Sequence, residues 1–249
     1  MSTPVAVTVA SPATPRAFHQ LIRRMDTSVG NTVGMRREET AAIGLDEAVA
    51  QTRTGDVWVF RGRSAADRAI HALTNAPVNH VAMALVLDDL PPLMWHAELG
   101  RSLLDHWSGD RHRGVQLHDL REAVDRWRTV YGQRAWLRQL EPEVNRAVED
   151  AALRVVARLD GVSFPSTTRL AWRWLRGRDR RDSPRRRRVR DIRPEVAYCA
   201  EVVALTYEEM GILEPTVPVS WYDPGRFWSG DRLPLRPGWA LGAEIPVAD

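Results

Sequence analysis

Residues 198–207 read Tyr-Cys-Ala-Glu-Val-Val-Ala-Leu-Thr-Tyr, and this stretch carries the single cysteine of the chain. A proline at position 194 and a glutamate at position 195 favour the first turn of a helix, and Gly211 is a stop signal. Between these limits, side chains suited to burial recur at helical spacing: Cys199, Val202, Val203, Thr206 and Met210. The sequence therefore predicts a helix that packs Cys199 against the rest of the protein.

The environment of this cysteine decides what it can do. A thiol in the first turns of a helix faces unpaired backbone N–H groups, which lower its pKa and favour the nucleophilic thiolate. A lone cysteine on an apolar helix face is also commonly a small buried hydrophobic residue. Cys199 is therefore either a nucleophile or a packing residue, and the choice depends on whether another segment brings a base to the sulfur.

The composition is that of a folded domain with a sizeable core. The chain has 249 residues, of which 44% are hydrophobic, so one domain with additions is the simplest division. A single cysteine excludes an intramolecular disulfide and a multi-cysteine metal site. All 35 basic residues are arginine, and the formal net charge is only +3. Bulk charge therefore does not indicate a protein that binds polyanions.

Several apolar runs predict the strands of a sheet. Val57–Phe60 follows a turn signal, His80–Leu87 is almost wholly apolar, and Leu93–Leu99 alternates. The period of two places Met94, His96 and Glu98 on one face of the last strand. Further along the chain we expect a short strand at 115–117, a helix at 119–127, a strand at 134–140 and a long helix opened by Pro142.

The candidate base for the thiol is one of seven histidines. His80 begins a buried strand, where its ring would lie at the end of the sheet, although it could equally be a structural residue. Glu98 is a natural acceptor to orient that ring, and His96 on the same face competes for either role. The other histidines of this region, His106, His112 and His118, lie in polar stretches that we expect to be exposed.

Five segments together resemble a known family, the permuted NlpC-type, YiiX-like branch of the papain-like cysteine peptidases and amidases. They match its opening strand, base strand, acidic strand, nucleophile helix and tail in the order of that branch: Thr54–Gly62, Pro77–Met83, Trp95–Glu98, Tyr198–Val203 and Tyr222–Phe227. Three positions depart from the family pattern, since Asn79, Ala82 and Ala200 replace Ser, Gly and Ser. Glu98 also follows Ala97 where the family has glutamate first.

The resemblance implies an α+β, circularly permuted papain-like fold, with an antiparallel sheet packed against helices over residues 47–249. It implies that Cys199 is the nucleophile, His80 the general base and Glu98 the orienting residue, with His96 as the alternative third residue. Tyr198 would support an oxyanion site. The expected enzyme is a thiol-dependent hydrolase or acyltransferase that cleaves a peptide, amide or acyl ester through an acyl-enzyme, with no cofactor and no metal.

Two segments lie outside this pattern. Residues 1–46 form an extension that we expect to be partly disordered or packed on the surface. Residues 166–193 form an Arg- and Trp-rich insert. Trp172, Trp174 and Arg185–Arg188 suit an anionic membrane surface, and binding of nucleic acid is less favoured. The alternative function is therefore a non-catalytic module that docks through the insert.

The expected location follows from the absence of export and anchoring signals. The short apolar run near the N-terminus has no basic residue ahead of it, which makes a poor signal peptide. No segment reaches the roughly 20 apolar residues of a membrane span. We expect a cytoplasmic protein, with peripheral membrane contact through the insert.

Overall fold

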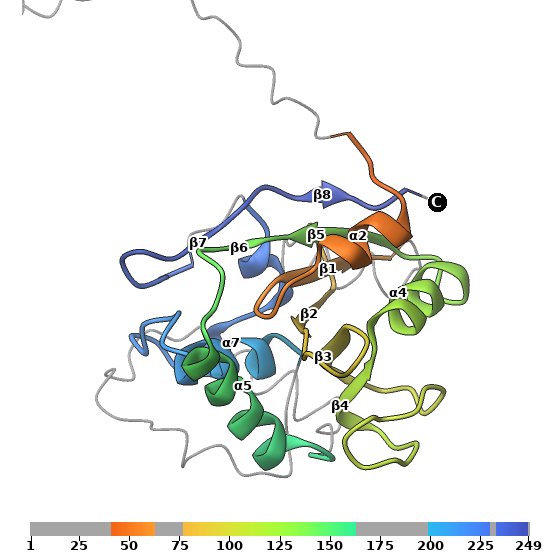
Figure 1. The fold of residues 1–249 in the computed structure, drawn as a ribbon. Coiled ribbons are helices and arrows are strands. Elements are labelled where there is room, and N and C mark those ends of the chain that lie inside the picture. The colour runs from red at the N-terminus through yellow and green to blue at the C-terminus, as the bar shows by residue number, and fades with distance from the viewer. Residues whose placement is uncertain (1–40, 63–76, 163–198, 230–232, 249) are drawn as a thin grey trace, which may run out of the picture. The chain divides into compact units, whose positions relative to one another are not determined.

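The computed structural model describes residues 41–62, 77–162, 199–229 and 233–248. All of them belong to the unit Thr40–Asp249. This unit is an α+β structure, as the sequence predicts, in which helices pack on both faces of an antiparallel sheet (Figure 1).

The sheet has six strands in the order β4-β3-β2-β1-β5-β8, and every neighbouring pair is antiparallel. Its strands are β1 (Val57–Arg61), β2 (His80–Leu85), β3 (Leu93–Glu98), β4 (Gly114–Asp119), β5 (Arg134–Arg138) and β8 (Ile245–Pro246). A second, two-stranded sheet pairs β6 (Leu140–Glu141) with β7 (Ala240–Leu241).

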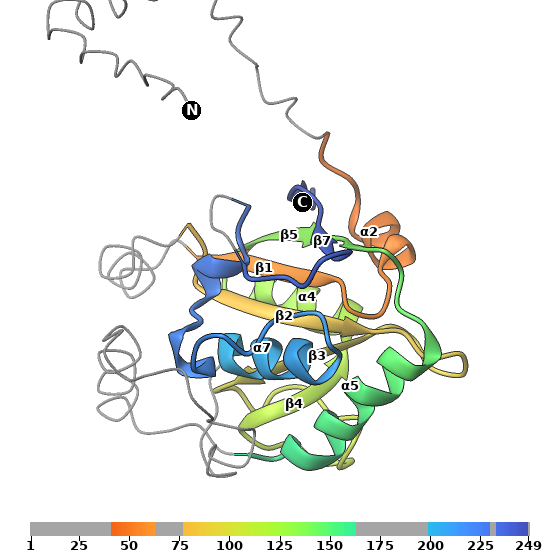
Figure 2. The same ribbon diagram turned by 90° about the vertical axis from the view of Figure 1, so that its left-hand side faces the viewer.

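Four helices cover the large sheet in the described part of the chain. One face carries α5 (Arg146–Leu159) and α7 (Cys199–Glu209), and the other carries α2 (Leu45–Gln51) and α4 (Leu120–Thr129), as Figure 2 shows. The short turns η2 (Val219–Trp221) and η3 (Pro224–Phe227) precede the last strands. Because both faces are covered, all six residues of β2 and all six of β3 are buried. That is why β2 is a nearly continuous apolar run, whereas β3 carries His96 and Glu98 into the interior.

Capping side chains set where two of the helices begin. The Asp119 carboxylate accepts the backbone N–H of Glu122, and the Asn145 side chain accepts that of Val148. Each cap satisfies one of the N–H groups that a helix leaves without a partner at its start. The prediction that Pro142 opens the long helix is therefore wrong. The helix begins four residues later, at Arg146, behind the better cap.

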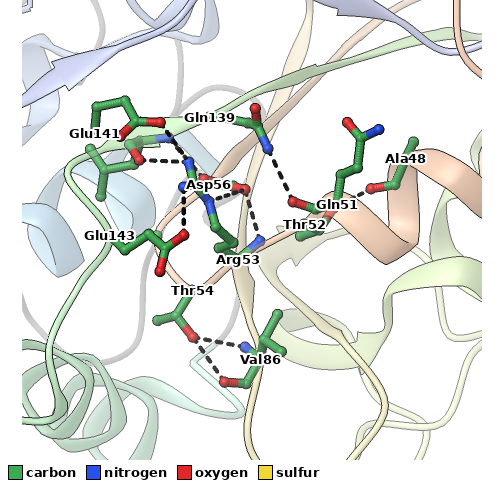
Figure 3. A network of polar contacts seen from close by, with 12 residues as sticks. Ala48, Gln51, Thr52, Arg53, Thr54, Asp56, Val86, Gln139, Glu141 and Glu143 are labelled. Atoms are coloured by element: carbon green, nitrogen blue, oxygen red, sulfur yellow. Dashed lines mark hydrogen bonds and ion pairs between the residues drawn. The ribbon is translucent and has the colours of Figure 1, made fainter.

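A buried carboxylate just before β1 ties this strand to the first residue of β6. Asp56 is fully buried, and its two oxygens accept the backbone N–H groups of Arg53 and Leu140, each at 2.8 Å (Figure 3). Burial raises the pKa of this carboxyl to about 6, against the hydrogen bonds that lower it. The Arg53 guanidinium pairs with Glu141 and Glu143 at the surface, each at 3.0 Å.

Two of the sequence-based expectations concern residues that the structure does not describe. Residues 1–40 of the predicted extension and the whole of the predicted Arg-rich insert, with Trp172, Trp174 and Arg185–Arg188, lie outside the described residues. The predicted division at residue 46 stays a prediction. Among the helices that the structure describes, none is long and apolar enough to cross a membrane.

We expect Asp56→Ala to lower the free energy of unfolding by about 2 kcal/mol, because it leaves the buried Leu140 N–H without an acceptor. Urea denaturation followed by circular dichroism measures this change. The matched control is Glu143→Ala, which removes an exposed ion pair in the same network and should cost less than about 1 kcal/mol. Equal effects of the two substitutions would contradict a structural role for the buried carboxylate.

Candidate functional site

Five polar side chains from three adjacent strands share one face of the sheet. Side chains two residues apart on a strand point to the same face. Ala82 and Met94, two residues from His80 and His96, belong to the core beneath α4, whereas Val81 and Trp95 belong to the core beneath α7. The polar set therefore lies on the α4 side: His80, His96, Glu98, Gln116 and His118. Each of the five is at least 95% buried.

Three of these side chains are histidines joined in a row by hydrogen bonds. His80 Nε2 lies 2.9 Å from His96 Nδ1, and His96 Nε2 lies 3.0 Å from His118 Nδ1. The row ends at Gln116, whose Oε1 is 3.0 Å from His118 Nε2. Trp127 of α4 covers it, because its ring stacks on the His80 ring with centroids 4.0 Å apart.

The amide of Gln116 sets the position of every proton in this row. Its Nε2 faces the backbone carbonyls of Glu98 and Gly114, at 3.4 and 3.3 Å, so its Oε1 faces His118. An oxygen there requires a proton on His118 Nε2, which leaves His118 Nδ1 as an acceptor. His96 must then donate from Nε2 and accept at Nδ1. His80 in turn donates from Nε2, so the lone pair of its ring lies on Nδ1.

Burial keeps the three imidazoles neutral, as this row requires. It lowers the pKa of His80 to about 3 and that of His118 to about 4, because a charged ring would lose its hydration. The pKa of His96 is also lowered well below its ordinary value, by burial and by the neighbouring rings of His118 and His80. A neutral His80 offers a lone pair on Nδ1, but a pKa of about 3 makes this ring a weak base in the resting protein.

Glu98 adjoins the row without joining it. The Tyr131 hydroxyl donates to Glu98 Oε1 at 3.0 Å, while Oε2 lies 3.8 Å from both His96 Nε2 and His118 Nδ1. Burial raises the pKa of this carboxyl, against the Tyr131 hydrogen bond that lowers it. His96, Glu98 and His118 together could hold a metal ion. In the described part of the chain, Asp105, His112 and Asp160 form a second set of this kind.

Cys199 lies on the opposite side of the sheet. Its side chain is 2% exposed and belongs to the apolar core that contains Val81, the residue after His80. Burial raises the pKa of the thiol to about 12, although the backbone N–H groups of Val81, Ala200 and Cys199 act to lower it. The expectation of a lowered thiol pKa is therefore wrong, because loss of hydration outweighs the N–H groups.

The structure brings the sequence-predicted site residues together only in part. His80, His96 and Glu98 meet, and Cys199 reaches the start of β2, but within the described residues no hydrogen bond joins its sulfur to the His80 ring. Tyr198 lies outside the described residues.

Two members of the cluster went unrecognised in the sequence. His118 was expected to be exposed, and this is wrong, because α4 covers it and leaves it 1% exposed. The alternation of Gln116 and His118 along β4, with Val115 and Leu117 between them, was the available signal.

Comparison with known proteins assigns no family. No protein-family model and no curated protein matches the chain. Among solved structures it is similar to the crystal structure of metalloprotein yiiX from Escherichia coli O157:H7. The TM-score is 0.46 and the sequence identity 16%, over 78% of this chain and 98% of that chain. A likeness of this size does not place the chain in a family.

We expect Cys199 in the resting protein to react with iodoacetamide at neutral pH about a hundredfold or more slower than a free cysteine, because little thiolate exists below a pKa of about 12. The rate should rise about tenfold per pH unit from pH 7 to 10, whereas a free cysteine levels off above pH 8.5. Mass spectrometry of the labelled chain gives both rates. The urea-unfolded protein is the control, and labelling as fast as in that control would contradict a sealed thiol.

Proposed function

We propose that the protein is a thiol-dependent hydrolase or acyltransferase that acts on a peptide, amide or acyl ester. In this proposal Cys199 is the nucleophile, His80 the general base and His96 the residue that orients the base. The observation that supports it most is the 2.9 Å hydrogen bond between His80 and His96, deep in the protein, which places the lone pair of the His80 ring on Nδ1. We further propose that the α+β fold is a circularly permuted papain-like one, since the base precedes the nucleophile in the chain.

The proposed reaction passes one proton through His80. The Cys199 sulfur attacks the carbonyl carbon while its proton moves to His80 Nδ1, because a thiol of high pKa needs a base during the attack. The protonated ring then gives this proton to the departing amine or alkoxide, and a thioester remains on Cys199. Water or an amine attacks the thioester, and His80 takes a proton from it before returning that proton to the sulfur.

In this proposal the thiol and the base must meet at the first residues of β2. The ladder between β2 and β3 runs only from Met83–Trp95 to Leu85–Leu93, so the first residues of β2 pair with β1 alone. The Cys199 sulfur lies beside the backbone of Val81, one of these first residues. The proposal requires the His80 ring, which stacks on Trp127 on one face of the sheet, and the Cys199 sulfur on the other face to come together at this end of β2 when substrate binds. This is a larger change than the tightening of a loose catalytic hydrogen bond.

His96 suits the orienting role better than Glu98. A base needs a partner on the ring nitrogen that does not face the nucleophile. His96 occupies that place on His80 Nε2, whereas the Glu98 carboxylate contacts His96, His118 and Tyr131. Glu98 was the first choice from the resemblance, and in this proposal His96 takes its place.

Cys199→Ala should lower kcat/KM by about 10³-fold or more, since nothing else in the proposed site can form the thioester. p-Nitrophenyl esters and acyl arylamides of several chain lengths serve as probe substrates. An acyl adduct on Cys199 should be found by mass spectrometry after rapid quenching. Glu209→Gln is the control on the same helix, where the half-exposed side chain pairs with Arg158. Turnover by Cys199→Ala equal to that of the control would refute the proposal.

Substituting His96 and Glu98 in turn shows which of them orients His80. We expect His96→Ala to lower kcat by about 10²- to 10⁴-fold, because His80 loses the partner that sets its tautomer. Glu98→Gln keeps an oxygen for Tyr131 and should lower kcat by less than about tenfold. Steady-state kinetics on the same esters measures both changes, and the reverse ranking would return the orienting role to Glu98.

A further inference from the structure

The three atoms beside the histidine row have the spacing of metal ligands. His96 Nε2 and His118 Nδ1 are 3.0 Å apart, and Glu98 Oε2 lies 3.8 Å from each. A triangle with these sides has its centre about 2.1 Å from all three corners, which is the length of zinc bonds to imidazole nitrogen and carboxylate oxygen. An ion at that point would lie in the plane of the three atoms, so tetrahedral coordination with a further ligand requires small shifts of these side chains.

Each of these side chains is also held from behind by a second polar group. His118 donates its other ring N–H to Gln116 Oε1, His96 Nδ1 is bonded to His80, and the second oxygen of Glu98 accepts the Tyr131 hydroxyl. Metal-binding histidines and carboxylates are commonly fixed in this way, because the outer partner sets the tautomer and the direction of the lone pair. The pattern is therefore that of a supported metal site.

We propose that His96, Glu98 and His118 bind one divalent transition-metal ion of the zinc class. Two imidazole nitrogens and one carboxylate oxygen suit zinc, cobalt or iron, whereas calcium and magnesium prefer oxygen ligands alone. Burial of all three residues protects such a site from competing water. The ion would occupy the place of the proton that His96 and His118 share, so the metal and the intact row of hydrogen bonds are alternatives.

Metal binding would reverse the hydrogen bond between His96 and His80. His96 must offer the Nε2 lone pair to the ion, so its proton moves to Nδ1 and is donated to His80 Nε2. His80 then carries its proton on Nδ1, the nitrogen that the proposed reaction needs free. The ion would thus switch off the base without any change in net protonation. This regulatory consequence rests on the proposed hydrolase, whereas the metal site itself does not.

Cobalt titration of the full chain tests the site directly. After dialysis against EDTA, Co²⁺ should bind with one equivalent per chain, give the visible absorption of a low-coordinate N and O site, and be displaced by Zn²⁺. His96→Ala and His118→Ala should abolish the spectrum, and Gln116→Leu should weaken binding by about 10- to 100-fold. Circular dichroism verifies that each variant is folded.

Two control variants separate this site from other possible ones. Cys199→Ser removes the thiol and His112→Ala removes the second candidate metal group, and neither should change the cobalt spectrum or the affinity. Absorption from sulfur–cobalt charge transfer, a spectrum lost in His112→Ala, or binding that persists in both His96→Ala and His118→Ala would overturn the proposal. Failure to bind one equivalent of Co²⁺ or Zn²⁺ would do so as well.

The regulatory consequence has its own readout. Zn²⁺ should inhibit ester hydrolysis by the wild-type protein, with EDTA restoring it, and the residual activity of Glu98→Gln should be at least tenfold less sensitive to the ion. Inhibition that is equal in Glu98→Gln would overturn the switch and point to zinc on the thiol. Protein that binds cobalt as expected but hydrolyses none of the probes would sink the proposed hydrolase and leave the metal site standing.

Discussion

A row of hydrogen bonds between neutral imidazoles, closed off by the sheet below and α4 above, constrains everything else at the candidate site. Three buried rings can be satisfied together only if each donates in the same direction, because a neutral imidazole has one donor and one acceptor. The Gln116 amide chooses that direction at one end. The other end, at His80, is left with a lone pair whose position was decided three side chains away.

The coverage of the sheet on both faces explains why this row is dry and why the thiol lies apart from it. Helix α4 packs Trp127 over the rings, and α7 packs Cys199 into the core of the other face. Desolvation then raises the pKa of the thiol and lowers that of the histidines, so both groups stay uncharged at neutral pH. In our proposal the neutral thiol gives its proton to the neutral imidazole only during attack, as a serine does to a histidine.

In our proposals the facing nitrogens of His96 and His118 either share a proton or bind a divalent ion, and the two compete for the same space. Glu98 favours the ion: its second oxygen points at both nitrogens from 3.8 Å, too far for a hydrogen bond and suited to sharing a ligand between them. Whichever occupant is present determines the direction of the bond to His80. The tautomer of the His80 ring would thus report the metal content of the protein.

Particular positions show how much of the fold and of the candidate site residue patterns alone predict. The apolar runs beginning at Val57, His80 and Leu93 predicted three central strands, and the period of two correctly placed His96 and Glu98 on one face. The same rule failed to single out His118, because its stretch is polar and only the packing of α4 shows that it is buried. Periodicity identifies the face of an element that is buried and says nothing of what buries it.

By itself, then, the sequence determined the five longer strands, the α+β class, and the buried helix that carries Cys199. Only the tertiary structure decided that this helix covers the face of the sheet opposite to the histidines, and that His96 rather than Glu98 holds His80. The physical reason is that local patterns follow from contacts within one element. The choice of sheet face and the pairing of side chains from β2, β3 and β4 depend on contacts between residues far apart in the chain.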